Sequence, residues 1–259
     1  MSTPETPKPR PRGIYLLPNL FTSAALFAGF FAIISASQGK FTEAAIAVFV
    51  AAVLDGLDGR VARLTNTQSE FGVQYDSLAD LVSFGMAPSL VMYHWSLSQL
   101  SYMGPFWGRL GWAIAFLYAA CAALRLARFN TQVGTVDKRW FIGLASPAAA
   151  GLMMSFVWTF AERGGGAMRY AALVVTAVAG LLMVSRVRYF SFKALPFGGR
   201  VPFVTVLAAI VLLVLLAVNP PQVLLGATVL YALSGPLGWL WGRLRRGRGK
   251  PASDDAPNA

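Results

Sequence analysis

The chain has little of what soluble proteins use for covalent or metal cross-links. Its 259 residues include one cysteine and one histidine, and only 13% of them are charged. A single cysteine, Cys121, excludes an internal disulfide and argues against a cysteine metal site. Acidic residues are also scarce, at 11 against 22 Lys and Arg. The positions of these few carboxylates are therefore informative.

Apolar residues are abundant instead, at 56% of the chain with a mean hydropathy of +0.57. Such a composition is typical of an integral membrane protein, and apolar runs of about 17 to 25 residues can cross a bilayer as helices. We predict an all-α, polytopic membrane bundle of about eight helices. The expected spans are residues 19–38, 41–64, 70–93, 111–129, 141–161, 168–184, 201–218 and 222–241, with a kink at Pro147 and a tight turn at Pro220 and Pro221.

The distribution of Lys and Arg predicts the orientation of these spans, because short cytoplasmic loops retain basic residues. With both termini in the cytoplasm, only Lys40, Arg109, Arg163 and Arg169 fall outside. The cations are spread over loops rather than gathered in a soluble domain, which argues against nucleic-acid binding. We expect one membrane domain over residues 13–244, between disordered cytoplasmic tails at 1–12 and 245–259, and no cleavable signal peptide.

Four of the acidic residues form one pattern within the apolar region. Asp55, Asp58, Asp76 and Asp80 occur in the spacing D-x2-D-G-x2-A-R-x8-G-x3-D-x3-D. Residues three or four apart share a helix face, so each of two consecutive helices presents a pair of carboxylates. A short turn joins these helices, so the two pairs can face each other near the cytoplasmic surface.

Converging carboxylates repel one another unless cations lie between them. Carboxylate oxygens suit Mg²⁺ or Mn²⁺, and two such ions can bridge phosphate oxygens at a transferring phosphorus. The small residues Gly56, Gly59, Ala62 and Gly72 would let a nucleotide or phosphate approach the backbone, although close helix packing also explains glycines. A transporter or channel with buried acids would account for the charges but not for the spacing.

The pattern resembles the signature of the CDP-alcohol phosphatidyltransferase family at each of its positions: Asp55, Asp58, Gly59, Ala62, Arg63, Gly72, Asp76 and Asp80. The resemblance implies attack by an alcohol on the lipid-side phosphorus of a CDP-linked donor, with release of CMP. It also implies that Asp55, Asp58, Asp76 and, in part, Asp80 bind two divalent cations, Mg²⁺ or Mn²⁺. Asp80 matches the proposed general base, and Gly59 and Arg63 match donor-contacting positions.

The flanking sequence resembles the branch of this family that converts CDP-diacylglycerol and L-serine to phosphatidylserine. The resemblance runs from about Leu16 to Leu244 and includes LPNLFTSAALFAGFFA, LDGLDGRVARLTNTQSEFGVQYDSLADLVSFGMAPSL, LRLARFN and YFSFK. Ala25 departs from it, since many members carry Asn there. Gly72, Asn19 and Thr22 complete the expected donor-binding set. Glycerol 3-phosphate, inositol phosphate and choline are alternative acceptors.

L-Serine carries a carboxylate beside its hydroxyl, so its pocket needs a fixed cation. The candidates for acceptor or phosphate binding lie on the expected cytoplasmic side: Arg125, Arg128, Asn130, Arg186, Arg188 and Lys193. They could equally set the topology or contact lipid headgroups. The family and branch resemblance further implies a homodimer in the bacterial inner membrane, with its active site facing the cytoplasm.

Overall fold

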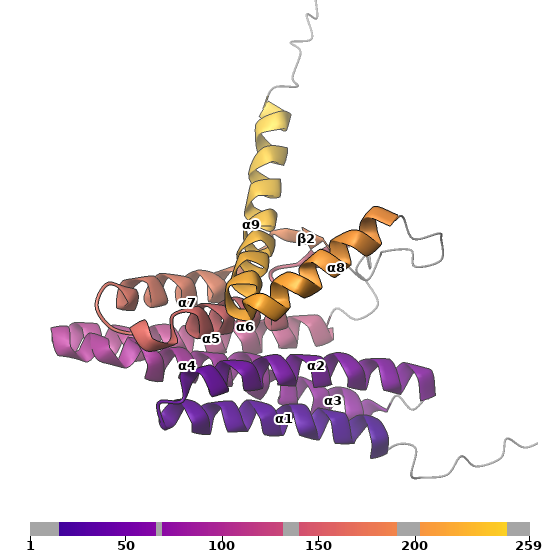
Figure 1. Ribbon diagram of the computed structural model, residues 1–259, viewed down its shortest axis with the longest axis horizontal. Coiled ribbons are helices and arrows are strands. Elements are labelled where there is room, and N and C mark those ends of the chain that lie inside the picture. Colours follow the sequence, from indigo (N-terminus) through magenta and orange to yellow (C-terminus); the bar gives the residue numbers. More distant parts are fainter. Residues whose placement is uncertain (1–15, 66–68, 132–139, 191–202, 248–259) are drawn as a thin grey trace, which may run out of the picture.

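The computed structural model describes residues 16–65, 69–131, 140–190 and 203–247. These residues are helical except for one short pair of antiparallel strands (Figure 1). The elements in chain order are α1 Leu16–Ser37, α2 Phe41–Thr65, α3 Glu70–Asp80, the π-helix η2 Leu81–Met86, α4 Ala87–Trp95, the 3₁₀ helix η3 Leu97–Met103, α5 Pro105–Thr131, β1 Trp140–Ile142, α6 Ser146–Thr159, the 3₁₀ helix η4 Ala161–Arg163, α7 Met168–Val184, β2 Arg188–Phe190, α8 Phe203–Val218 and α9 Pro220–Gly247.

Helices α1 and α2 pack against each other along their length (Figure 1). Alanines recur every three or four residues on the buried face of α1, at Ala25, Ala28, Ala32 and Ala36. The buried face of α2 is also rich in alanine. Small residues let two helices approach closely, and this packing holds helices together where lipid removes the hydrophobic driving force. The seam brings the start of α1 beside the end of α2.

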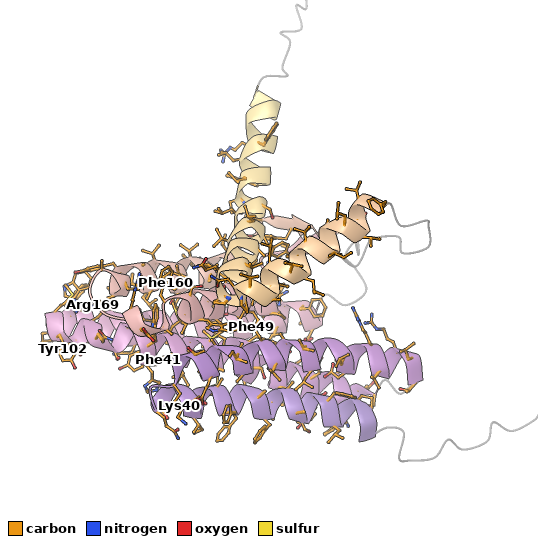
Figure 2. All side chains as sticks on the ribbon, in the orientation of Figure 1. Lys40, Phe41, Phe49, Tyr102, Phe160 and Arg169 are labelled. Carbon is orange, nitrogen blue, oxygen red and sulfur yellow. The ribbon has the colours of Figure 1, made fainter. Side chains whose placement is uncertain are left out.

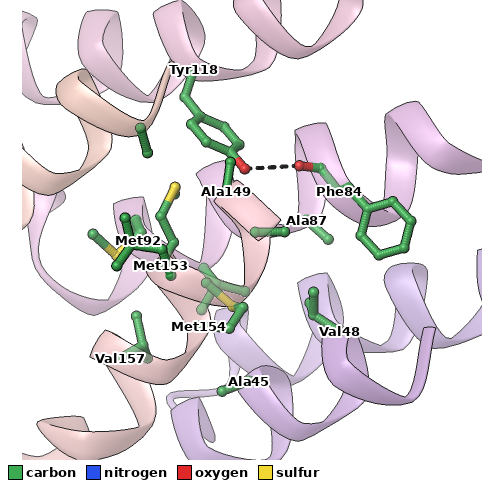
Figure 3. Close-up of a cluster of buried hydrophobic side chains, with 14 of the residues drawn as sticks. Ala45, Val48, Phe84, Ala87, Met92, Tyr118, Ala149, Met153, Met154 and Val157 are labelled. Atoms are coloured by element: carbon green, nitrogen blue, oxygen red, sulfur yellow. Dashed lines mark hydrogen bonds between the residues drawn. The ribbon is translucent and has the colours of Figure 1, made fainter. Parts of the chain in front are cut away.

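The third expected span is one helix in which the hydrogen-bonding pattern changes after Asp80. Helix α3 passes directly into the π-helix η2 and then into α4. The Tyr118 hydroxyl on α5 donates to the carbonyl of Phe84 at 3.0 Å (Figure 3), and the Ser83 hydroxyl donates to the carbonyl of Ala25 at 3.1 Å. Single π turns are common near functional sites. Here the π turn is tied to both α5 and α1.

The span expected at residues 141–161 is wrong at its start. Residues 140–142 instead pair with residues 188–190, and α6 begins only at Ser146, with Pro147 in its first turn. Proline lacks the N–H that the first helical turn leaves unused, so Pro147 starts the helix and does not kink it. Gly143 makes the corner before it with φ +81°, and its N–H donates to the carbonyl of Val187 at 2.8 Å.

Three helices of the described residues are long and apolar enough to cross a membrane: Pro18–Ser37, Pro105–Thr131 and Pro220–Trp241. Two shorter apolar helices, Met168–Val184 and Phe203–Val218, add to them. The large apolar side chains of α8 are exposed, as expected of a surface that faces lipid. The chain is a membrane protein with several apolar helices. Helix α9 runs to Gly247.

The two ends of the packed bundle differ in what they carry. Lys40, Tyr102 and Arg169 lie toward one end (Figure 2). The C-terminal end of α2 lies at the opposite end (Figure 1). Asp55 and Asp58 are in the half of α2 next to that end, and Asp76 and Asp80 are in the second half of α3.

Candidate active site

Three of the four aspartates form one cluster. Asp55 comes from α2, and Asp76 and Asp80 come from α3. One carboxylate oxygen from each lies within 4.8 Å of the others. The fold brings them together because α2 and α3 both pack against α1. Ser69 caps the start of α3, where its hydroxyl accepts a hydrogen bond from the N–H of Gly72 at 3.0 Å.

The fourth aspartate, Asp58, is held by a different contact. Its side chain is buried, with 5% exposure, and the Thr22 hydroxyl of α1 donates to Oδ2 at 2.7 Å. The same hydroxyl also lies 3.2 Å from the carbonyl of Pro18, but the carboxylate is the closer acceptor. Asp58 interacts electrostatically with Asp55 and with Asp76. Helix α1 therefore orients the carboxylate that stands beside the cluster.

Two observations indicate that the cluster suits a divalent cation: its donor atoms are carboxylate oxygens, and one of them is buried without a hydrogen bond to any described residue. Asp80 and Asp55 approach within hydrogen-bonding reach of each other. Asp76 Oδ1 is buried and has no hydrogen-bond partner among the described residues. A buried carboxylate oxygen without a partner is costly, and a bound cation would remove that cost. Asp55, Asp76 and Asp80 are thus suited to hold a hard divalent ion, with Asp58 next to it.

A cavity of about 340 Å³ opens beside the carboxylates, between α1, α2 and α3. Gly59 has open space where a side chain would begin, whereas a Cβ on Gly72 would lie 3.1 Å from the Ser69 hydroxyl. Gly59 thus keeps a wall of the cavity clear, and Gly72 leaves room for the Ser69 hydroxyl that caps α3. All residues expected to bind the donor line this cavity: Asn19, Thr22, Gly59, Arg63 and Gly72.

Arg125 is an acceptor candidate on α5 with a partly buried side chain. Its Nη1 donates to the Ser146 hydroxyl at 2.8 Å, and its buried Nε has no hydrogen-bond partner among the described residues. It interacts electrostatically with the carboxylate of Asp80. Within the described chain no carboxylate lies at ion-pair distance from it. A guanidinium that is mostly buried and lacks an anionic partner can accept the carboxylate of a ligand.

The other acceptor candidates lie in α5, in or just before β2, or outside the described residues. Asn130 donates to the Ser77 hydroxyl at 3.0 Å and so joins the end of α5 to α3 beside Asp76. Arg128 is partly exposed in the last turn of α5, and Arg186 is exposed just before β2. The backbone of Arg188 pairs with Ile142, and Lys193 lies outside the described residues.

Two polar residues beside the site were not identified from the sequence. Ser146 accepts the hydrogen bond from Arg125, and Tyr231 of α9 lies in the same neighbourhood. Ser146 directly precedes Pro147, a pair typical of a helix start, and that signal would have placed its hydroxyl at a helix end. Tyr231 lies in an apolar helix with no motif around it, so the sequence offers no comparable signal.

Comparison with known proteins agrees with this geometry. Residues 15–182 match the model of the CDP-alcohol phosphatidyltransferase family. The chain belongs to that family. A Helicobacter pylori protein named CDP-diacylglycerol–serine O-phosphatidyltransferase is 41% identical over 233 residues, 88% of this chain and 92% of the relative. A Bacillus subtilis protein of the same name is 32% identical over 179 residues, 68% of this chain and 91% of the relative.

Proposed function

We propose that the protein is a phosphatidylserine synthase, which converts CDP-diacylglycerol and L-serine to phosphatidylserine and CMP. The observation that carries the proposal is the cluster of Asp55, Asp76 and Asp80 beside a cavity lined by the donor-binding candidates. Relatives named for this reaction, one of them aligned over most of the chain, support serine as the acceptor.

The CDP group of the donor is proposed to occupy the cavity between α1, α2 and α3. Gly59 leaves room for phosphates close to the backbone, Gly72 lines the same cavity, and Arg63 offers a cation at the exposed rim. Asn19 and Thr22 supply polar groups from α1. The donor's acyl chains would then extend toward the apolar helix surfaces that face lipid.

Asp55, Asp58, Asp76 and Asp80 are proposed to hold two divalent cations, Mg²⁺ or Mn²⁺. When bound, these ions would neutralise charge on the pyrophosphate of the donor. By placing these ions, the carboxylates would keep the phosphorus next to Asp80. Phosphoryl transfer depends mainly on positioning and charge neutralisation, so the rigid placement of these side chains is the protein's main contribution.

The serine hydroxyl attacks the lipid-side phosphorus, and a new P–O bond forms. The bond from that phosphorus to the bridging pyrophosphate oxygen breaks, and CMP leaves with the electron pair. Asp80 accepts the hydroxyl proton. Arg125 binds the serine carboxylate on the same side, and Arg128, Asn130, Arg186, Arg188 and Lys193 contribute to acceptor or phosphate binding around it.

Feeding the purified protein CDP-diacylglycerol with one alcohol at a time tests the acceptor. We expect CMP release with L-serine, and little or none with glycerol 3-phosphate, inositol phosphate or choline. Choline lacks the carboxylate, and inositol phosphate lacks the amino group. CMP release with one of these alcohols and none with serine would leave the family assignment intact and refute serine as the acceptor.

The proposed topology has eight spans, both termini and the active site in the cytoplasm, and residues 13–244 as one membrane domain. Its support is the basic bias of the loops and the position of Lys40 and Arg169 toward the end of the bundle opposite the C-terminal end of α2 (Figures 1 and 2). By family resemblance, we place the enzyme in the bacterial inner membrane as a homodimer.

The contact between Thr22 and Asp58 gives a prediction for metal binding. Thr22→Val keeps the side-chain shape but removes the hydroxyl that donates to Asp58. Loss of such an orienting partner typically weakens metal affinity about 10- to 100-fold. The Mn²⁺ concentration for half-maximal activity should rise accordingly, and bound Mn²⁺ measured by electron paramagnetic resonance should fall in parallel.

Thr159→Val is the matched control for this experiment. The Thr159 hydroxyl donates only to the carbonyl of Ser155 in its own helix, at 2.8 Å. This variant should bind Mn²⁺ as the unmodified protein does. Equal Mn²⁺ affinity in the two variants would rule out an orienting role for Thr22.

A further inference from the structure

Two hydrogen bonds define how α5 lies along the span that contains α3 and η2. The Tyr118 hydroxyl donates to the carbonyl of Phe84 at 3.0 Å (Figure 3), and the Asn130 amide donates to the Ser77 hydroxyl at 3.0 Å. The later residue of α5 contacts the earlier residue of the other span, so the two helices run antiparallel. The part of α5 between these bonds therefore faces the part of the other span between Ser77 and Phe84.

Arg125 and Asp80 lie within these two facing parts. Arg125 comes seven residues after Tyr118, which is about two helical turns, so both side chains lie on the same face of α5. Asp80 comes three residues after Ser77 and shares the face of α3 that contacts α5. The register of the two helices thus places Arg125 opposite Asp80.

Ser146 holds the guanidinium from a third helix, α6. Nη1 of Arg125 donates to the Ser146 hydroxyl at 2.8 Å, and Ser146 is fully buried. Ser146 is the first residue of α6, and the chain just before it is fixed as well, because the N–H of Leu144 donates to the carbonyl of Leu182 on α7 at 3.0 Å. The hydroxyl that accepts from Arg125 is therefore held in place by the backbone around it.

The bond to Ser146 does not use the edge of the guanidinium that binds carboxylates side-on. That edge consists of Nε and Nη2, whose N–H groups point the same way, and Nη1 lies outside it. Nε of Arg125 is buried and has no hydrogen-bond partner in the part of the chain that the structure describes. The N-terminus of α6 supplies no anion, because it is the positive end of the helix dipole. The Nε–Nη2 edge therefore suits the carboxylate of a ligand.

We propose that Ser146 is a positioning residue for the acceptor: by holding Nη1 of Arg125, it directs the Nε–Nη2 edge to the carboxylate of an amino-acid acceptor whose hydroxyl reaches Asp80. In L-serine, two carbons separate the hydroxyl oxygen from the carboxylate carbon, so its two groups can contact neighbouring residues. The identity of the acceptor rests on the proposed function, whereas the bond between Ser146 and Arg125 does not.

Ser146→Ala tests the positioning role. The KM for serine should rise about 3- to 10-fold, the size of one hydrogen bond, while kcat and the KM for CDP-diacylglycerol stay within about twofold. Ser155→Ala is the matched control, because Ser155 is a fully buried serine of the same helix whose hydroxyl meets that of Thr228 on α9 at 3.1 Å. An unchanged KM for serine, or an equal rise in both KM values, would refute the role of Ser146.

A double-mutant cycle of Ser146→Ala and Arg125→Met, followed by the Tm in detergent, tests the bond itself. Methionine keeps an apolar stem but has no donor, so Ser146→Ala should lower the Tm in the unmodified background and much less in the Arg125→Met background. Equal shifts in both backgrounds would refute the bond. The cycle needs no acceptor, so coupled Tm shifts without CMP release from serine would overturn the proposed acceptor and leave the bond in place.

Discussion

Asp80→Asn should lower kcat for CMP release about 10²- to 10⁴-fold, the usual contribution of a general base. The amide has nearly the shape of the carboxylate but cannot take the hydroxyl proton, and it binds a cation more weakly. Asp80 also stands within 4.8 Å of Asp55 and Asp76, so its loss removes one of three clustered oxygens. The measurement is CMP release at saturating Mn²⁺, which offsets weaker metal binding and leaves the proton-transfer defect.

The variant should fold and still bind the donor, since Asp80 does not line the cavity. Binding of CDP-diacylglycerol and the Tm report this separately from turnover. Glu43→Gln is the matched control, because Glu43 forms an exposed pair with Lys40 at 3.9 Å and such pairs contribute little. Normal turnover by Asp80→Asn would exclude Asp80 as the base.

Arg125→Gln should lower kcat/KM for serine about 30-fold or more. The expected size is that of removing one partner of a buried charge pair, about 2 to 5 kcal/mol. The guanidinium is mostly buried, with one bond to Ser146 and no carboxylate partner among the described residues, so the serine carboxylate would be the anion it lacks. The KM for CDP-diacylglycerol should change little.

Ethanolamine sharpens this experiment because it has the hydroxyl and amine of serine but no carboxylate. If Arg125 binds the carboxylate, the variant should lose activity with serine and keep whatever activity it has with ethanolamine. Arg169→Gln, toward the other end of the bundle, is the control (Figure 2). A rise in the KM for CDP-diacylglycerol instead would assign Arg125 to the donor phosphates.

Residues at i, i+3 and i, i+4 share a face, so the spacing predicted two pairs, Asp55 with Asp58 and Asp76 with Asp80, that face each other. The structure clusters Asp55, Asp76 and Asp80, and holds Asp58 beside them through Thr22. Their partners could not be found in this way. Thr22 is 36 positions from Asp58, and Ser146 is 21 from Arg125, so these contacts depend on how the helices pack.

The region around residues 140–147 marks the limit of the sequence analysis for the fold. A strand of three residues is too short to show the alternation of apolar and polar residues that identifies a strand. The apolar residues before and after Pro147 therefore suggested one long helix. The pairing of β1 with β2 depends on the corner at Gly143 and on a segment far along the chain. The contact between Tyr189 and Ala232, 43 positions apart, is equally invisible to local patterns.

The π turn after Asp80 changes the direction in which side chains point on the two sides of it, in α3 before the turn and in α4 after it. Helix α3 sets the direction of the Asp76 and Asp80 side chains. Helix α4, beyond η2, sets the direction of the core residues Ala87 and Val91. Each residue turns an α-helix by about 100°, so deleting one residue within Leu81–Met86 would rotate the carboxylates away from Asp55 if the core kept its packing. Alignments of relatives through this stretch should therefore tolerate substitutions far better than a single-residue gap.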